Sequence, residues 1–349
     1  MKEKKDRGSM NRRKFIRLVA ATAGGSAFLS KAGSQTVPPA KSQERGSPRA
    51  QVPMAYRKLG RTNFLSSRLV FGCGAALAGG KAVRLLDRAF EAGINNYDVG
   101  SNVVYKGSEQ SLAPFLKAHR DQIWVSSKAP LLSLKVKPEE TVTLEQAKTA
   151  ADSWTKLLDA SLRDLQTERI HAYYLMAVDN PSLVSSEEMY KAFLGAKSAG
   201  KVGYFGLSTH KNAAKSLEAA IKTGWYDLAM IGITPAGWYD WNTKKLEEGT
   251  PTLAELQPLL KRAREAGIGL IGMKTVRYLA PMSAVGQGYP SAFDQCYDEK
   301  FKASSLSPFQ RALAFVLEHG MDVVNADMQN FAHLEENIVA ASTSKSYFA

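Results

Sequence analysis

The sequence predicts an α/β fold in which eight strand–helix units close into a (β/α)8 barrel, a TIM barrel, over residues 54–349. Eight short apolar segments alternate with longer segments of helical periodicity, and no repeated tight turns join the segments into hairpins. About 290 residues accommodate eight such units. The predicted strands are residues 69–72, 96–98, 123–128, 170–175, 202–208, 228–232, 269–274 and 323–326.

Helix-start signals follow the strand segments. Thr143 and Gln146 form a capping box before an apolar face that includes Trp154. Ser307 and Gln310 form a second one, with proline at the first helical position. A doubly wound open sheet is the alternative, but the turn after the first strand lacks the third glycine of a dinucleotide-binding fingerprint. In a barrel, functional side chains should follow the carboxyl ends of the strands.

Composition excludes several classes of protein. The chain has 349 residues, of which 44% are apolar, so it can bury a large core. The net charge is +13, but residues 1–50 carry +9 of it, and the rest of the chain has no dense basic stripe. Nucleic-acid binding is therefore not predicted. The two cysteines cannot by themselves build a zinc or iron–sulfur site, and two free thiols are favoured over one disulfide.

Residues 1–32 are predicted to be a twin-arginine (Tat) signal peptide. The segment Met10-Asn-Arg-Arg-Lys-Phe-Ile-Arg17 resembles the Tat motif, and a weakly apolar stretch and a small-residue site at 30–32 follow it. The apolar stretch, residues 18–29, is too short for a stable membrane span. An amphipathic basic tail is the alternative. Residues 33–53 are predicted to be a flexible linker. We expect the Tat translocase as a partner during export, and a periplasmic or secreted protein.

Five segments, in order along the chain, resemble the aldo-keto reductase family. Residues 56–62 resemble its opening hairpin, 93–98 its second strand, and 105–109 its Tyr-Gly-x-Ser-Glu element. Residues 200–208 resemble its fifth strand and 334–337 its closing helix. The resemblance implies a TIM barrel that transfers hydride between a nicotinamide cofactor, NADP or NAD, and a small-molecule carbonyl or sugar substrate.

The resemblance implies three catalytic residues of the family's Asp-Tyr-Lys-His tetrad. Asp98 ends the second strand, Tyr105 lies in the loop after it, and Lys128 ends the third strand. A carbonyl that accepts hydride needs a proton donor, and a nearby ammonium makes a phenol a better acid. The alternatives are a structural Asp–Lys ion pair and a surface-loop tyrosine. Asp98 and Tyr105 are seven positions apart, whereas the family usually has five, so the loop is longer.

The fourth position of the implied tetrad holds Met176, where the family has histidine. A thioether cannot donate a hydrogen bond to a carbonyl oxygen. The polarisation of the substrate carbonyl that the family's histidine gives must therefore come from another group or be lost. His171 lies near the opposite end of the same strand. His210 follows the fifth strand, at the correct barrel mouth, either as a catalytic group or as a loop residue that caps the next helix.

The resemblance also implies a set of cofactor-binding positions. They are Ser208 and Thr209 after the fifth strand, Met230 on the sixth, Lys274 after the seventh, and Glu336 and Asn337 on the closing helix. Asp327 and His333 occupy the positions that usually hold the 2′-phosphate of NADP. Because a carboxylate repels a phosphate, NAD is as plausible as NADP.

Two functions stay open at this stage. The first is an exported oxidoreductase that interconverts a carbonyl and an alcohol. The alternative is a catalytically silent or ligand-binding barrel that has lost the histidine. The loop 237–242 has two tryptophans in four residues, which suit a sugar or aromatic ligand as well as they suit a packing cluster. A metal-dependent hydrolase has little support, because no His-x-His or His-Glu-x-x-His pair occurs.

Overall fold

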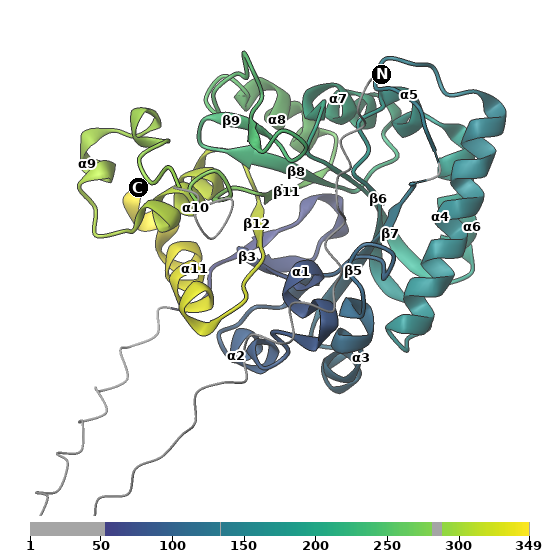
Figure 1. The fold of residues 1–349 in the computed structure, drawn as a ribbon, viewed down its shortest axis with the longest axis horizontal. Helices are drawn as coiled ribbons and strands as arrows, with labels where there is room; N and C mark the ends of the chain where they lie inside the picture. The colour runs from purple at the N-terminus through teal and green to yellow at the C-terminus, as the bar shows by residue number, and fades with distance from the viewer. Residues whose placement is uncertain (1–52, 133, 281–287, 349) are drawn as a thin grey trace, which may run out of the picture. The chain divides into compact units, whose positions relative to one another are not determined.

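Eight parallel strands close into a barrel in the order in which they occur along the chain (Figure 1). Each strand pairs with the next, and β12 pairs with β3 to complete the ring. All eight predicted strands and the predicted TIM barrel are confirmed. The strands are β3 (Leu69–Gly72), β4 (Asn96–Asp98), β5 (Trp124–Pro130), β6 (Ile170–Met176), β7 (Val202–Thr209), β8 (Leu228–Thr234), β11 (Gly269–Met273) and β12 (Val323–Ala326).

Two antiparallel hairpins are added to this ring. β1 (Tyr56–Lys58) pairs with β2 (Leu65–Ser67), which is the predicted opening hairpin. β9 (Gly237–Asp240) folds back on the end of β8 and pairs with β10 (Lys245–Leu246). The sequence predicted a loop here, because the hairpin is short and its first strand contains a glycine. The hairpin extends the barrel wall on the side where β8 ends.

Helices follow the strands and surround the barrel (Figure 1). Both predicted capping boxes are present, at Thr143 before α4 and at Ser307 before α10. The α-helices are α1 (Cys73–Leu77), α2 (Leu85–Glu91), α3 (Ser108–His119), α4 (Leu144–Asp164), α5 (Pro181–Val184), α6 (Glu187–Ser198), α7 (Ala213–Thr223), α8 (Gln257–Glu265), α9 (Glu299–Lys302), α10 (Pro308–His319) and α11 (Phe331–Thr343). Short 3-10 helices are Gly60–Thr62, Ala78–Gly80, Asp294–Cys296 and Ser344–Tyr347.

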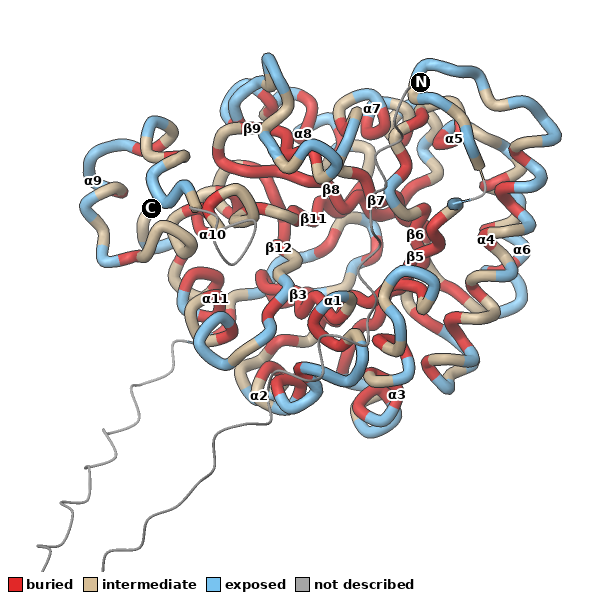
Figure 2. The backbone as a smooth tube through the Cα atoms, in the orientation of Figure 1, coloured by how far each residue is buried: buried red, intermediate tan, exposed pale blue. Residues whose placement is uncertain are grey.

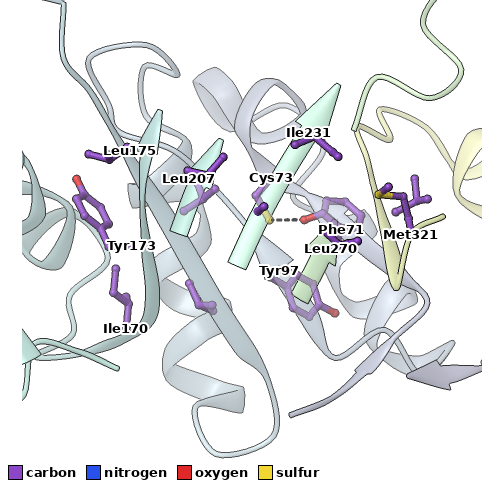
Figure 3. Packing of buried hydrophobic residues seen from close by; sticks show 14 of the residues in the cluster. Phe71, Cys73, Tyr97, Ile170, Tyr173, Leu175, Leu207, Ile231, Leu270 and Met321 are labelled. Atoms are coloured by element: carbon purple, nitrogen blue, oxygen red, sulfur yellow. Dashed lines mark hydrogen bonds between the residues drawn. The ribbon is translucent and has the colours of Figure 1, made fainter. Parts of the chain in front are cut away.

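The core has one layer between strands and helices and another inside the barrel. Burial follows the strands and the inner faces of the helices (Figure 2). Figure 3 shows part of the outer layer, where Phe71, Cys73 and Tyr97 lie close together. The thiol of Cys73 faces the carbonyl oxygen of Phe71 at 3.5 Å, and burial raises its pKa. Cys73 and Cys296 are both free thiols, as predicted.

This computed structural model describes residues 53–132, 134–280 and 288–348. The predicted signal peptide, 1–32, and all of the predicted linker except its last residue therefore lie outside the described residues. None of the helices within these ranges is long and apolar enough to cross a membrane.

Candidate active site

A buried ion pair joins the ends of two neighbouring strands. The Lys128 ammonium on β5 donates to Oδ2 of Asp98 on β4 and, at 2.5 Å, to the carbonyl oxygen of Val99. The side chains of Asp98 and Lys128 are only 4% and 7% exposed. Ser126 donates to the other carboxylate oxygen, Oδ1, at 3.0 Å. The structure thus brings together two of the predicted catalytic residues, each with its charge compensated.

Asn325 is a site residue that the sequence analysis missed. It lies at the end of β12, and its Nδ2 donates to Asp98 Oδ2 at 2.6 Å. The signal in the sequence was a lone amide among apolar residues near the carboxyl end of a predicted strand. Sequence distance hid the contact, since Asp98 and Asn325 are 227 positions apart.

Tyr105 lies over the backbone that follows Asp98. Its ring packs on Gly100 and Gly74, where an added Cβ would come within 2.8 Å and 3.0 Å of ring carbons. Asp98 acts electrostatically on the phenol, and burial, Asp98 and Asp327 together raise its pKa to about 12. In the described part of the chain, no hydrogen bond joins the Tyr105 hydroxyl to Lys128. Burial and two carboxylates therefore raise the phenol pKa, and its expected lowering by Lys128 stays a prediction.

Glu109 ties the Tyr105 loop to the strand that carries Lys128. This buried carboxylate accepts from Ser127 Oγ at 2.6 Å and from the backbone N–H of Asn102 at 3.2 Å. The side chain of Asn102 in turn accepts from the backbone N–H of Gly107 at 2.5 Å. Burial raises the pKa of Glu109. The loop is therefore held at both ends.

The structure places Met176 and His171 toward opposite ends of β6, and His210 directly after β7. Met176 is the last residue of β6, is half-buried, and lies in register with Pro130. His171 lies toward the other end of β6, where its Nδ1 accepts from the N–H of Val125 at 3.0 Å. Burial lowers the pKa of His171 and of His210 to about 4, so both imidazoles are neutral at pH 7.

His210 lies just after β7, at the predicted mouth. It does not cap α7, since the N-cap residue is Asn212. Its Nδ1 is buried without a hydrogen-bond partner among the described residues, which leaves this nitrogen for a ligand or a water molecule. Lys274 and Asp240 are the charged groups with the largest electrostatic effects on it.

Three cations surround Trp241 next to the β9–β10 hairpin. Lys244 Nζ, Lys274 Nζ and Arg277 Cζ lie 2.9, 4.1 and 5.9 Å from the ring centroid. Within the described ranges none of them has a carboxylate within ion-pair distance. Burial lowers the pKa of Lys274 to about 8. Such a like-charged cluster is an anion-binding environment. Trp238, by contrast, belongs to the packed core, so the two tryptophans of this loop have different roles.

The predicted cofactor positions on the strands line the same barrel mouth. Ser208 is buried and lies in register with Met230, whose sulfur is 3.5 Å from Asn325 Nδ2. The hydroxyl of Thr209 donates to the carbonyl of Lys211 at 2.7 Å. The buried hydroxyl of Thr275, next to Lys274, has no partner among the residues that the structure describes. The Thr275 hydroxyl and the three cations near Trp241 fit the polar and phosphate groups of a dinucleotide.

Glu336 and Asn337 lie on α11. Glu336 accepts a hydrogen bond from Ser307 Oγ, and its backbone carbonyl accepts from Gln310 Nε2 at 3.0 Å. Glu336 therefore fastens α11 to the start of α10. Asn337 is 7% exposed. Their predicted contact with a cofactor stays a prediction.

Comparisons with known proteins agree with this geometry. The family model for the aldo/keto reductase family matches residues 69–346. An aldo-keto reductase structure from Pseudomonas aeruginosa is similar over 85% of this chain and 98% of its own, with 21% identity and a TM-score of 0.59. The aldo-keto reductase AKR11C1 from Bacillus halodurans, in its holo form, is similar over 82% of this chain and 90% of its own, with 20% identity and a TM-score of 0.60.

The thermostable aldo-keto reductase Tm1743, solved with the inhibitor epalrestat, covers 82% of this chain and 94% of its own, at 18% identity and a TM-score of 0.55. No curated protein sequence matches the chain. At these identities the solved structures show the fold, whereas the family model spans most of the chain. The chain therefore belongs to the aldo/keto reductase family.

Proposed function

We propose that this protein is a nicotinamide-dependent oxidoreductase that interconverts a carbonyl and an alcohol on an aldehyde, a ketone or a sugar. The observation that carries the proposal is the buried Asp98–Lys128 pair beside the backbone on which Tyr105 packs. The bound dinucleotide supplies or accepts the hydride, and Tyr105 is the only phenol that we assign to proton transfer. The family is one of oxidoreductases, which supports this chemistry.

Each group of site residues has its own role in the proposed reaction. Lys128 places a positive charge near the phenol, and Asp98 and the Val99 carbonyl fix the direction of that ammonium. Lys244, Lys274 and Arg277 hold the phosphates, and the positions Ser208, Thr209 and Met230 form the wall around the nicotinamide. We propose that Met176 stands in the place of the catalytic histidine, so that the carbonyl is polarised by Tyr105 without an imidazole. Such a site favours carbonyls that are already electron-poor.

The proposal is tested by titrating the purified barrel, residues 50–349, with NADH and with NADPH. We expect tight binding of at least one dinucleotide, followed by reduction of reactive aldehydes or ketones in a screen. Binding without turnover, and with no gain from Met176→His, would favour the silent ligand-binding barrel. Failure to bind either dinucleotide would reject the proposed oxidoreductase function.

Lys274→Met is expected to weaken dinucleotide binding by about tenfold, since one charged hydrogen-bond donor is lost. The pKa of Lys274 lies at about 8, so we also expect the wild-type affinity for the dinucleotide to fall as the pH rises through this value. The variant should lack this step. Quenching of the intrinsic tryptophan fluorescence measures both effects. Lys261→Met, on the exposed side of α8, is the control and should bind like the wild type.

We further propose that the protein is exported in folded form by the Tat pathway and acts in the cell envelope. The support is the Arg12-Arg13 pair followed by Lys-Phe-Ile. Since the Tat route carries folded proteins, the dinucleotide could be bound before export. Arg12→Lys together with Arg13→Lys is expected to retain the full-length chain in the cytoplasm. Fractionation and immunoblotting of the two forms test this, and unchanged export would reject it.

A further inference from the structure

Asn325 is the polar residue of β12, which otherwise has the sequence Val-Val-Asn-Ala. Its amide nitrogen is the group that faces Asp98, since the amide oxygen would be repelled by a carboxylate at 2.6 Å. The other contact of this nitrogen is the sulfur of Met230, which is a weak acceptor. The strong interaction of the Asn325 side chain is therefore the one with Asp98.

The barrel leaves space for this amide at Gly72 of β3. A Cβ at Gly72 would lie 2.6 Å from Asn325 Oδ1 and 2.8 Å from the carbonyl oxygen of Ala326. Both distances are shorter than any van der Waals contact allows, so the neighbouring strand accommodates Asn325 only with glycine at this position. The amide is thus confined from one side by β3 and bonded on the other side to Asp98.

Asp98 Oδ2 accepts hydrogen bonds from two strands at once, from Lys128 on β5 and from Asn325 on β12. Ser126 occupies the other oxygen. The carboxylate is consequently held from three directions and cannot turn about its own axis without losing a charge-assisted bond. The Lys128 ammonium donates to this carboxylate and to the Val99 carbonyl, so fixing the carboxylate also fixes the position of the ammonium.

We propose that Asn325 is a positioning residue of the active site, which fixes the Asp98 carboxylate and, through it, the Lys128 ammonium relative to Tyr105. This inference rests on the proposed function. The charged groups that act electrostatically on the Tyr105 phenol are Asp98, from β4, and Asp327, just after β12, and Asp98 is itself bonded to Lys128. An amide at position 325 adds a positive dipole end to this set, whereas a carboxylate would add a third negative charge.

Asn325→Asp is the informative variant, because it keeps the shape and replaces the donor with a charged acceptor. Asn330→Asp is the charge-matched control. It lies five positions further along, where Asn330 caps α11, and aspartate caps a helix as well as asparagine does. Asn325→Ser retains a shorter donor and should behave between Asn325→Asp and the wild type.

The first measurement needs no turnover. The free energy of unfolding in urea is compared for Asn325→Asp in the wild-type background and in an Asp98→Asn background. We expect a clear fall in the denaturation midpoint in the wild-type background and a much smaller one with Asp98→Asn, since the repelling carboxylate is then gone. Equal falls in both backgrounds would show that Asn325 does not act through Asp98, and would overturn the proposal.

The second measurement is the pH profile of alcohol oxidation by the folded variants. Oxidation requires the phenolate, so a higher phenol pKa moves the rising limb of kcat/KM to higher pH. We expect Asn325→Asp to move this limb upward by roughly one pH unit, which lowers kcat/KM about tenfold at every pH below the limb, with unchanged dinucleotide affinity. Asn330→Asp should change neither. If the unfolding measurements show coupling between Asn325 and Asp98 but the rising limb of kcat/KM does not shift, Asn325 has a structural role only. That result would also overturn the proposal.

A wild-type protein that neither binds a dinucleotide nor turns over would reject the proposed function itself. The unfolding comparison would then still decide whether Asn325 fixes Asp98. The two ideas therefore fail in distinguishable ways.

Discussion

Lys128→Met is expected to lower kcat/KM for carbonyl reduction by about 10²- to 10⁴-fold, the usual contribution of a general acid–base group. The ammonium donates to the carbonyl oxygen of Val99, next to Gly100 on which Tyr105 packs, and the Lys128 side chain is only 7% exposed. Methionine keeps the length of the side chain but removes the charge and the hydrogen bonds to Asp98 and to the carbonyl of Val99. Steady-state kinetics with the best substrate from the aldehyde and ketone screen measures the loss.

The control for this variant is Lys148→Met, an exposed position on the outer face of α4. It should retain wild-type turnover. Dinucleotide titration of Lys128→Met separates a loss of chemistry from a loss of binding, and we expect the affinity to change little. A variant with the wild-type rate, correctly folded, would contradict the assignment of Lys128 to the reaction.

Asp98→Ala is expected to reduce the free energy of unfolding by about 3–5 kcal/mol, the usual cost of removing one partner of a buried ion pair. The change leaves the Lys128 ammonium with only the Val99 carbonyl, and it also removes the acceptor for Ser126 and Asn325. Urea denaturation of the barrel, residues 50–349, measures the effect. Asp152→Ala, at an exposed position of α4, should change the stability by less than about 0.5 kcal/mol.

A double variant tests whether the two charges stabilise each other. Asp98→Ala combined with Lys128→Met removes both charges, so neither is left buried alone. Its loss of stability should be smaller than the sum of the two single losses, since contacting residues are not additive. Additive losses would show that the two side chains do not stabilise each other.

The architecture could be predicted from local patterns. A buried parallel strand is a short apolar run, and an outer helix has one apolar face, so both leave a periodic signal within ten to twenty residues. The capping boxes at Thr143 and Ser307 and the eight strands were found in this way. The predicted strands also gave the strand ends, and these place Asp98 and Lys128 at the mouth of the barrel.

Other parts of the site depend on contacts between residues that are distant in sequence. Nothing near Asn325 indicates a bond to Asp98, and nothing near Trp241 indicates that Lys274 and Arg277 lie beside it. The expected effect of Lys128 on Tyr105 was also incomplete. A pKa depends on burial and on every charge nearby, and burial together with Asp98 and Asp327 raises the pKa of Tyr105.

The sequence by itself determined the barrel, its order of strands and the residue types at the strand ends, because these follow from periodicity and short-range signals. Only the tertiary structure decided which of those residues share a carboxylate, which cations gather around one aromatic ring and how acidic the phenol is. Closing the ring brings β12 back to β3 and β4, and that closure is a property of the whole chain.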